Sequence, residues 1–230
     1  MSFRELRKEI KHQLSMNYVY YVWALFAVSL VLNVYLVYLL LLYYITNIGT
    51  SPYSVLTFLY SNMLLTFAIE IVGFAFIGAF AFVIFRLLQS LKVHKEKLIT
   101  VLSSADMPNI SESINEIRNL KVPGALLPAI LMVFFYFVPP LEIVSIILAF
   151  YYIYRAHVVI KLFEKLEEKA YAALGIKLER KKTQDHNFAL YFIITIITLG
   201  LFMLYLIHEI VSEFNHHVSE DYRMLESVEF

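Results

Sequence analysis

The chain has 230 residues, of which 60% are hydrophobic and 17% are charged, and its formal net charge is zero. Soluble domains carry about 25% charged residues, whereas here the stretch between Lys11 and Arg86 contains a single charged side chain, Glu70. This composition predicts an all-α integral membrane protein and excludes a bulk electrostatic attraction to nucleic acid. The absence of cysteine excludes disulfides, thiol catalysis and cysteine-based metal sites.

Residues 1–17 combine four basic side chains with apolar residues at helical spacing. This pattern is typical of an amphipathic helix that lies on a membrane surface. Residues 18–88 then hold two long apolar runs separated by an uncharged link at 47–52, which predicts a first transmembrane hairpin. Residues 89–122 are polar and basic, and we expect a cytoplasmic helical segment there because basic residues concentrate on that side.

Residues 123–156 contain an apolar run that is interrupted by Pro139 and Pro140. The run from Pro123 to Tyr154, 32 residues, would be about 48 Å long as one straight helix, which exceeds the hydrocarbon core of roughly 30 Å. A proline pair breaks a helix, and basic residues flank both ends of the run. The sequence therefore predicts a helical hairpin with both ends in the cytoplasm, either spanning the membrane or re-entrant.

The remaining sequence divides into three segments. Residues 157–187 form a predicted cytoplasmic amphipathic helix and loop, in which the helix continues past Arg155 and ends near Gly175. Residues 188–211 are predicted as a last transmembrane segment, and residues 212–230 as an acidic amphipathic tail. The basic N-terminal segment is expected in the cytoplasm. If residues 188–211 cross the membrane once, the C-terminus lies outside. A turn at Thr198–Gly200 is the alternative, and it would return the tail to the cytoplasm.

The apolar segment from Phe188 to Leu206 contains Thr198, Leu199 and Gly200 followed by Phe202 and Tyr205. It resembles a family of small uncharacterised prokaryotic membrane proteins that carry a Thr-x-Gly-aromatic pattern in a late apolar segment. The first aromatic residue is displaced to Phe202 in this chain. The resemblance implies membrane residence and no particular chemistry.

Glu70 is the sharpest functional candidate, because an acid inside hydrocarbon is expensive and commonly functional. Asn62, Thr66 and Glu70 share one helix face, and Asn33 lies on the first span. Facing helices would form a polar seam, which serves either as an ion or proton pathway or as hydrogen bonding between helices. Glu142 follows the proline pair and either caps a helix at the interface or faces a cavity of a re-entrant hairpin.

Metal-ligating patterns are weak in this sequence. Glu213, His216 and His217 have the spacing of helical metal ligands, but one such copy is insufficient for a site, and we interpret them as a solvated helix face. His12, His94, His157 and His186 occur singly, and no phosphate loop or hydrolase motif is present. We therefore predict neither an enzyme nor a cofactor.

The composition and the predicted elements favour a bundle of about five membrane segments, including the proline hairpin, with cytoplasmic amphipathic helices. The expected function is that of a non-catalytic membrane subunit or scaffold, and the alternative is a small cation or proton channel or transporter around Glu70. The expected partners are the lipid bilayer and a second copy or another membrane protein. The expected location is the cell membrane, in a chain whose composition is typical of a thermophile.

Overall fold

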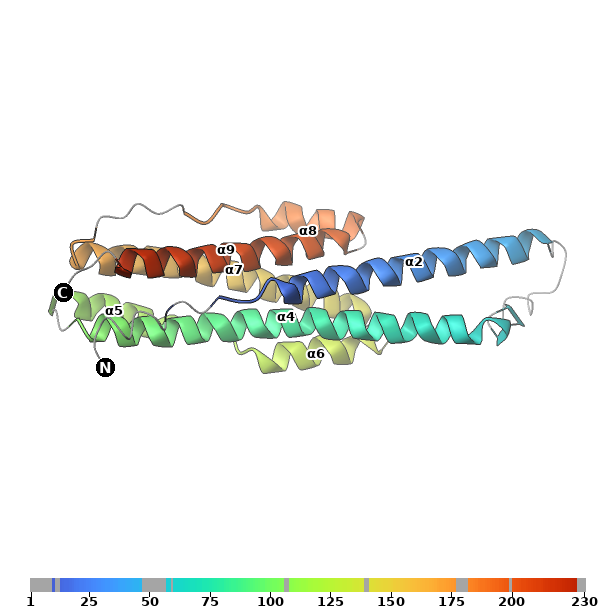
Figure 1. The fold of residues 1–230 in the computed structure, drawn as a ribbon, viewed down its shortest axis with the longest axis horizontal. Coiled ribbons are helices and arrows are strands. Elements are labelled where there is room, and N and C mark those ends of the chain that lie inside the picture. The colour runs from blue at the N-terminus through green and yellow to red at the C-terminus, as the bar shows by residue number, and fades with distance from the viewer. Residues whose placement is uncertain are drawn as a thin grey trace. The chain divides into compact units, whose positions relative to one another are not determined.

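The computed structural model describes residues 10, 13–46, 57–58, 60–105, 108–138, 141–176, 182–198 and 200–226. All regular structure within these residues is helical (Figure 1). Three of the described helices are long and apolar enough to cross a membrane, namely α2 (Asn17–Thr46), α4 (Met63–Ser103) and α7 (Glu142–Ala173). The all-α class and the membrane-type composition of its helices thus agree with the prediction.

The chain forms two compact units, one of which consists of Asn17–Phe80. This unit contains α2 and the beginning of α4. The rings of Phe26 and Phe76 lie 5.7 Å apart, and those of Tyr43 and Phe58 lie 5.2 Å apart. Because the earlier residue of α2 meets the later residue of the partner segment, the two helices run antiparallel, as a first hairpin requires. The link at 47–52 lies outside the described residues.

The second unit consists of residues 1–16 and Ala81–Phe230. Within it, α4 continues without a break to Ser103, so the expected segment 89–122 begins inside a helix. Beyond α4, the 3-10 turn Pro108–Ile110 leads into α5 (Ser111–Asn119), which packs against α7. Lys95 on α4 donates hydrogen bonds to the carbonyl oxygens of Arg118 (2.6 Å) and Leu120 (2.8 Å), and so caps the end of α5.

Helix α6 (Leu126–Tyr136) packs against α7, and the Ser145 hydroxyl donates to the Met132 carbonyl at 2.8 Å. Pro139 and Pro140 lie between these helices and outside the described residues. Helix α7 then continues past Arg155 and ends at Ala173, as expected. Gly175 has φ +74°, a left-handed conformation that glycine adopts at little cost.

The apolar run predicted as a last transmembrane segment, 188–211, is divided into two helices. Helix α8 (Phe188–Ile197) ends before Gly200, whose φ is +91°, and α9 (Leu201–Glu226) begins immediately afterwards. The Tyr191 and Phe202 rings lie 5.0 Å apart, because α8 folds back along α9 (Figure 1). The run is therefore not one continuous helix, because the left-handed Gly200 follows the end of α8. The turn falls at the position of the alternative prediction.

Helix α9 packs along α7, and its C-terminal half reaches the end of α4. The carboxylate of Asp221 lies 3.2 Å from the imidazole of His94. The described part of the predicted tail, residues 212–226, therefore packs beside the end of α4. Asn215 on α9 also holds the N-terminal segment. Its side chain accepts a hydrogen bond from the Leu14 amide (2.7 Å) and donates one to the Leu14 carbonyl (2.8 Å).

Candidate metal centre

Four polar side chains occupy core positions of a three-helix arrangement formed by the end of α4, α7 and α9. Each follows the 3–4 spacing of the apolar residues that surround it. On α4, His94 occupies one position of the buried helix face whose other residues are Leu87, Leu91, Leu98 and Leu102. Glu167 occupies the equivalent position in the series Ile160, Phe163 and Ala170 on α7. His217 and Asp221 continue the series Ile210 and Phe214 on α9.

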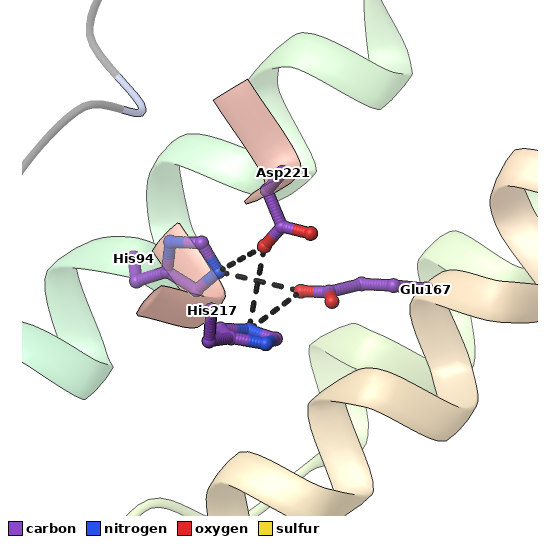
Figure 2. A group of neighbouring side chains, drawn as sticks. All are labelled: His94, Glu167, His217 and Asp221. Carbon is purple, nitrogen blue, oxygen red and sulfur yellow. Dashed lines mark hydrogen bonds and ion pairs between the residues drawn. The ribbon is translucent and has the colours of Figure 1, made fainter. Parts of the chain in front are cut away.

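The four side chains converge on one point and are fully buried (Figure 2). Nε2 of His94 lies 3.3 Å from Oε1 of Glu167 and 3.2 Å from Oδ2 of Asp221. Nε2 of His217 lies 3.4 Å from the same oxygen of Glu167 and 3.3 Å from the same oxygen of Asp221. Two nitrogen and two oxygen atoms therefore alternate around a closed ring with nearly equal edges.

Packing holds the His94 ring in this position. Phe163 and Phe214 contact it edge-on, with ring centroids 5.5 Å and 6.3 Å away. Burial opposes protonation of the ring, but hydrogen bonds and charges from Asp221 and Glu167 outweigh this effect and raise the pKa of His94 from 6.5 to about 9. His94 lies beyond Arg86, outside the apolar part of α4. Without another cation, a protonated His94 therefore partly balances the two carboxylates.

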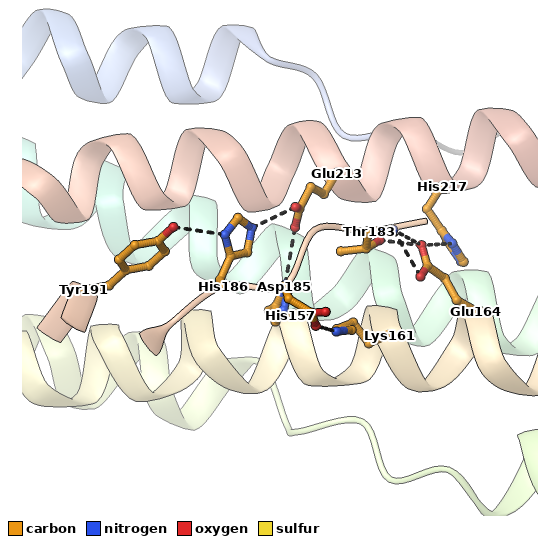
Figure 3. A network of polar contacts seen from close by, with 9 residues as sticks. All are labelled: His157, Lys161, Glu164, Thr183, Asp185, His186, Tyr191, Glu213 and His217. Carbon is orange, nitrogen blue, oxygen red and sulfur yellow. Dashed lines mark hydrogen bonds and ion pairs between the residues drawn. The ribbon is translucent and has the colours of Figure 1, made fainter. Parts of the chain in front are cut away.

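A further carboxylate lies behind His217. Oε1 of Glu164 lies 3.9 Å from Nδ1 of His217, the nitrogen that faces away from the four-residue cluster (Figure 3). Glu164 also accepts hydrogen bonds from the backbone amide of Thr183 (3.0 and 3.2 Å) and from its hydroxyl. At 3.9 Å the two groups are within ion-pair range, and a carboxylate behind a histidine is a common arrangement in metal sites.

The predicted polar seam around Glu70 does not converge in this way. Asn33 donates to the Ser29 carbonyl (2.8 Å), Asn62 to the Phe58 carbonyl (2.9 Å) and Thr66 to the Asn62 carbonyl (3.3 Å). These hydrogen bonds satisfy each side chain within its own segment. Glu70 and Asn33 are exposed, and no hydrogen bond joins them among the residues that the structure describes.

The other predicted site residues are dispersed. Pro139, Pro140 and the side chain of Glu142 lie outside the described residues. Glu213 and His217 belong to two different groups of side chains, and His216 is exposed beside them. Glu213 thus groups with His157 and His186, while His216 and Glu213 share only the lining of a pocket.

Sequence analysis missed His94, Glu167 and Asp221. The available signal was their position, because each interrupts the apolar face of an amphipathic helix, where a polar residue needs a partner. The pairing of these faces across three helices separated in the chain cannot be read from spacing within one helix.

No known protein family, curated protein or solved structure matches the chain. The resemblance of the segment around Gly200 to a family of prokaryotic membrane proteins stays a prediction.

Proposed function

We propose that this chain is a membrane protein whose extramembrane helical bundle binds a divalent transition-metal ion through His94, Glu167, His217 and Asp221. The observation that carries the proposal is the closed ring of two imidazole nitrogens and two carboxylate oxygens. Zinc binds imidazole nitrogen at 2.0–2.1 Å and carboxylate oxygen at 2.0–2.2 Å, so neighbouring ligand atoms of a tetrahedral site lie about 3.3 Å apart. The four edges in this protein are 3.2–3.4 Å.

Charge supports the same assignment. The four side chains carry two negative charges when both histidines are neutral, and burying uncompensated charge is costly. A divalent cation at the centre of the ring would neutralise them. It would replace the proton that His94 carries in the metal-free protein.

The donor set favours a borderline metal over a hard one. Imidazole ligands suit zinc, nickel, copper and iron, whereas calcium and magnesium take oxygen ligands. Two histidines and two carboxylates in a closed, fully buried site are most compatible with a four-coordinate Zn²⁺. A closed site with four protein ligands is typical of a structural metal, since catalytic zinc sites keep an open position.

Such an ion would join α4, α7 and α9. We therefore propose a non-catalytic scaffold whose three helices are locked together by metal, in line with the function expected from the sequence. The membrane part would anchor this bundle. The lipid bilayer is its proposed partner, and a cell membrane is the proposed location.

Metal analysis of the purified protein tests this proposal. We expect the protein to retain about one zinc ion per chain after dialysis against metal-free buffer, since structural zinc binds with apparent free energies of about 10–16 kcal/mol. The double variant Glu167→Gln/Asp221→Asn keeps the size and polarity of both side chains but should retain no zinc. His216→Ala, an exposed neighbour, is the matched control. Equal zinc content in wild type and the double variant, or none in either, would overturn the proposal.

The membrane topology that we propose keeps the five segments expected from the sequence, with the last one, residues 188–211, folded at Gly200. Helices α2 and α4 cross the membrane, and the Pro139–Pro140 hairpin enters and leaves on the cytoplasmic side. Helix α6 has 11 residues, or about 16 Å, which supports a re-entrant arm that reaches halfway across the core. The turn at Gly200 would likewise return α9 to the cytoplasm. All 19 Lys and Arg residues of the chain would then lie on the cytoplasmic side.

A cation or proton pathway around Glu70 is the second candidate function. Its support is an exposed acid on an apolar helix, which in a bilayer requires either a wet path or a second copy of the chain that pairs with it. Ion flux into liposomes, measured for wild type and Glu70→Gln, tests it. The absence of flux in both proteins would exclude the pathway.

A further inference from the structure

A second group of metal-binding side chains lies between α7, α9 and the segment 182–187 that precedes α8 (Figure 3). His157 comes from α7, His186 from the connecting segment and Glu213 from α9. One donor atom of each lies within 4.8 Å of the others. Their side chains are only 5%, 5% and 10% exposed.

We propose that His157, His186 and Glu213 form a second, exchangeable site for a divalent transition-metal ion, with a fourth position open to water or a small anion. Two histidines and one glutamate are the protein ligands of several open zinc sites, in which solvent supplies the remaining ligand. The second site shares no ligand with the four-residue cluster.

The geometry explains why this site would bind more weakly than the closed one. Oε2 of Glu213 lies 3.3 Å from Nδ1 of His157, which already matches the separation of two ligands on one metal. Oε1 of Glu213 lies 2.7 Å from Nε2 of His186, a direct hydrogen bond. The two contacts use different oxygens of Glu213. An ion bound to one of these oxygens must therefore break the His186 hydrogen bond and move the carboxylate or the ring until the ligand atoms lie about 3.3 Å apart. That cost lowers the affinity.

Polar contacts hold the His186 ring and the segment that carries it in place. Nδ1 of His186 lies 3.3 Å from the hydroxyl of Tyr191, so the ring has a polar partner opposite its metal-facing nitrogen. The segment that carries His186 is held against α7 by the Thr183–Glu164 hydrogen bonds and by an ion pair between Asp185 and Lys161. These contacts fix the segment on both sides of Gln184.

A pocket beside Glu213 supports an open fourth position. A pocket of about 240 Å³ adjoins the group, and Glu213 belongs to its lining together with Glu209, Ser212 and His216. Pockets for drug-sized ligands have about 300–1,000 Å³, so this one suits water or a small anion. Along α7, His157 and Glu167 are separated by 167 − 157 = 10 residues, or about 15 Å. Along α9, Glu213 and His217 are four residues, or about 6 Å, apart. Both separations exceed the roughly 3.5–4 Å between paired catalytic metals, so two ions would act separately.

Titration with Co²⁺ tests the proposal, because its visible absorption reports coordination number and ligand exchange. In the Glu167→Gln/Asp221→Asn protein, which lacks the closed site, we expect one Co²⁺ to bind and its spectrum to shift on addition of azide. Adding His186→Ala to that protein should weaken Co²⁺ binding at least about 100-fold. The control is His208→Ala, a histidine on α9 that belongs to neither group, and it should leave the Co²⁺ affinity unchanged.

The outcomes separate the two sites. Loss of zinc from the double variant with no remaining Co²⁺ binding would overturn the second site and leave the first intact. Co²⁺ binding that is unaffected by His186→Ala, or a spectrum that azide leaves unchanged, would also overturn it. Thermal unfolding in chelator, compared between each variant and wild type, identifies variants that fail to fold. If the His186→Ala protein fails to fold, the milder His157→Gln substitution is used in its place. Co²⁺ binding that this substitution leaves unchanged would also overturn the second site.

Discussion

His94 and Asp221 lie on helices far apart in the sequence, yet their Nε2 and Oδ2 atoms are 3.2 Å apart and both side chains are fully buried. This contact joins the end of α4 to the C-terminal half of α9. It exists only because the chain reverses at Gly200, which lets α9 run back along α7. One local turn thus decides whether the acidic end of the chain meets the histidine.

The metal-free protein should become less stable as pH rises from about 6.5 to about 9. The pKa of His94 is about 9 in the folded chain and 6.5 as its ordinary value, because Asp221 and Glu167 favour the protonated ring despite burial. Its contribution is therefore complete below pH 6.5 and lost as pH passes 9, and it amounts to about 3 kcal/mol. Chemical denaturation in chelator at several pH values measures this loss.

His94→Gln is the control for the pH experiment, and its stability should be nearly flat over the same range. Bound zinc should reverse the trend in wild type, because metal competes with the proton for His94 and binds more tightly at higher pH. A metal-free wild type whose stability rises between pH 6.5 and 9 would contradict the role given to His94.

Gly200→Ala should destabilise the fold, whereas Gly78→Ala should not. Apart from the adjacent backbone, no atom lies within 4 Å of a Cβ added at either position, so clashes with packed neighbours play no part. Gly200 has φ +91°, a conformation that costs alanine about 1–2 kcal/mol. Gly78 lies inside α4, where alanine gains up to about 1 kcal/mol of helix propensity. Thermal unfolding in detergent compares the two, and equal effects would argue against a strained turn.

Asn215→Ala should release the N-terminal segment from α9. Asn215 both accepts from the Leu14 amide and donates to its carbonyl, and the Leu14 side chain is 2% exposed. Removing the amide leaves two backbone groups without these bonds, at a cost of about 1–3 kcal/mol. Faster hydrogen exchange at Leu14 and faster proteolysis near it should follow. Ser219→Ala, at an exposed position of α9, should leave both rates unchanged.

Cysteine labelling should place the C-terminal part of α9 on the same side of the membrane as the end of α4. The natural chain has no cysteine, so single substitutions report one position each. Ser103→Cys at the end of α4 and Ser219→Cys on α9 should react with a membrane-impermeant reagent from the same side of sealed vesicles. The contact between His94 and Asp221 requires this result. Reaction of Ser219→Cys from the opposite side alone would contradict the described arrangement of α9.

The sequence by itself determined the helical class, the membrane-type runs and the continuous helix through Arg155. These properties depend on composition and on local periodicity, which the residues of one segment carry on their own. Sequence also identified Thr198–Gly200 as a place for a turn, because glycine tolerates left-handed φ.

Only the tertiary structure decided that the chain turns at Gly200 and that α9 packs along α7. It also decided which polar residues meet. Glu70 and Asn33 were predicted as a pair, but no hydrogen bond joins them among the described residues. The side chains that do converge in the core are those of His94, Glu167, His217 and Asp221. The physical reason is that a metal centre depends on the alignment of three helices, and spacing along one chain specifies a helix face without specifying which face it meets.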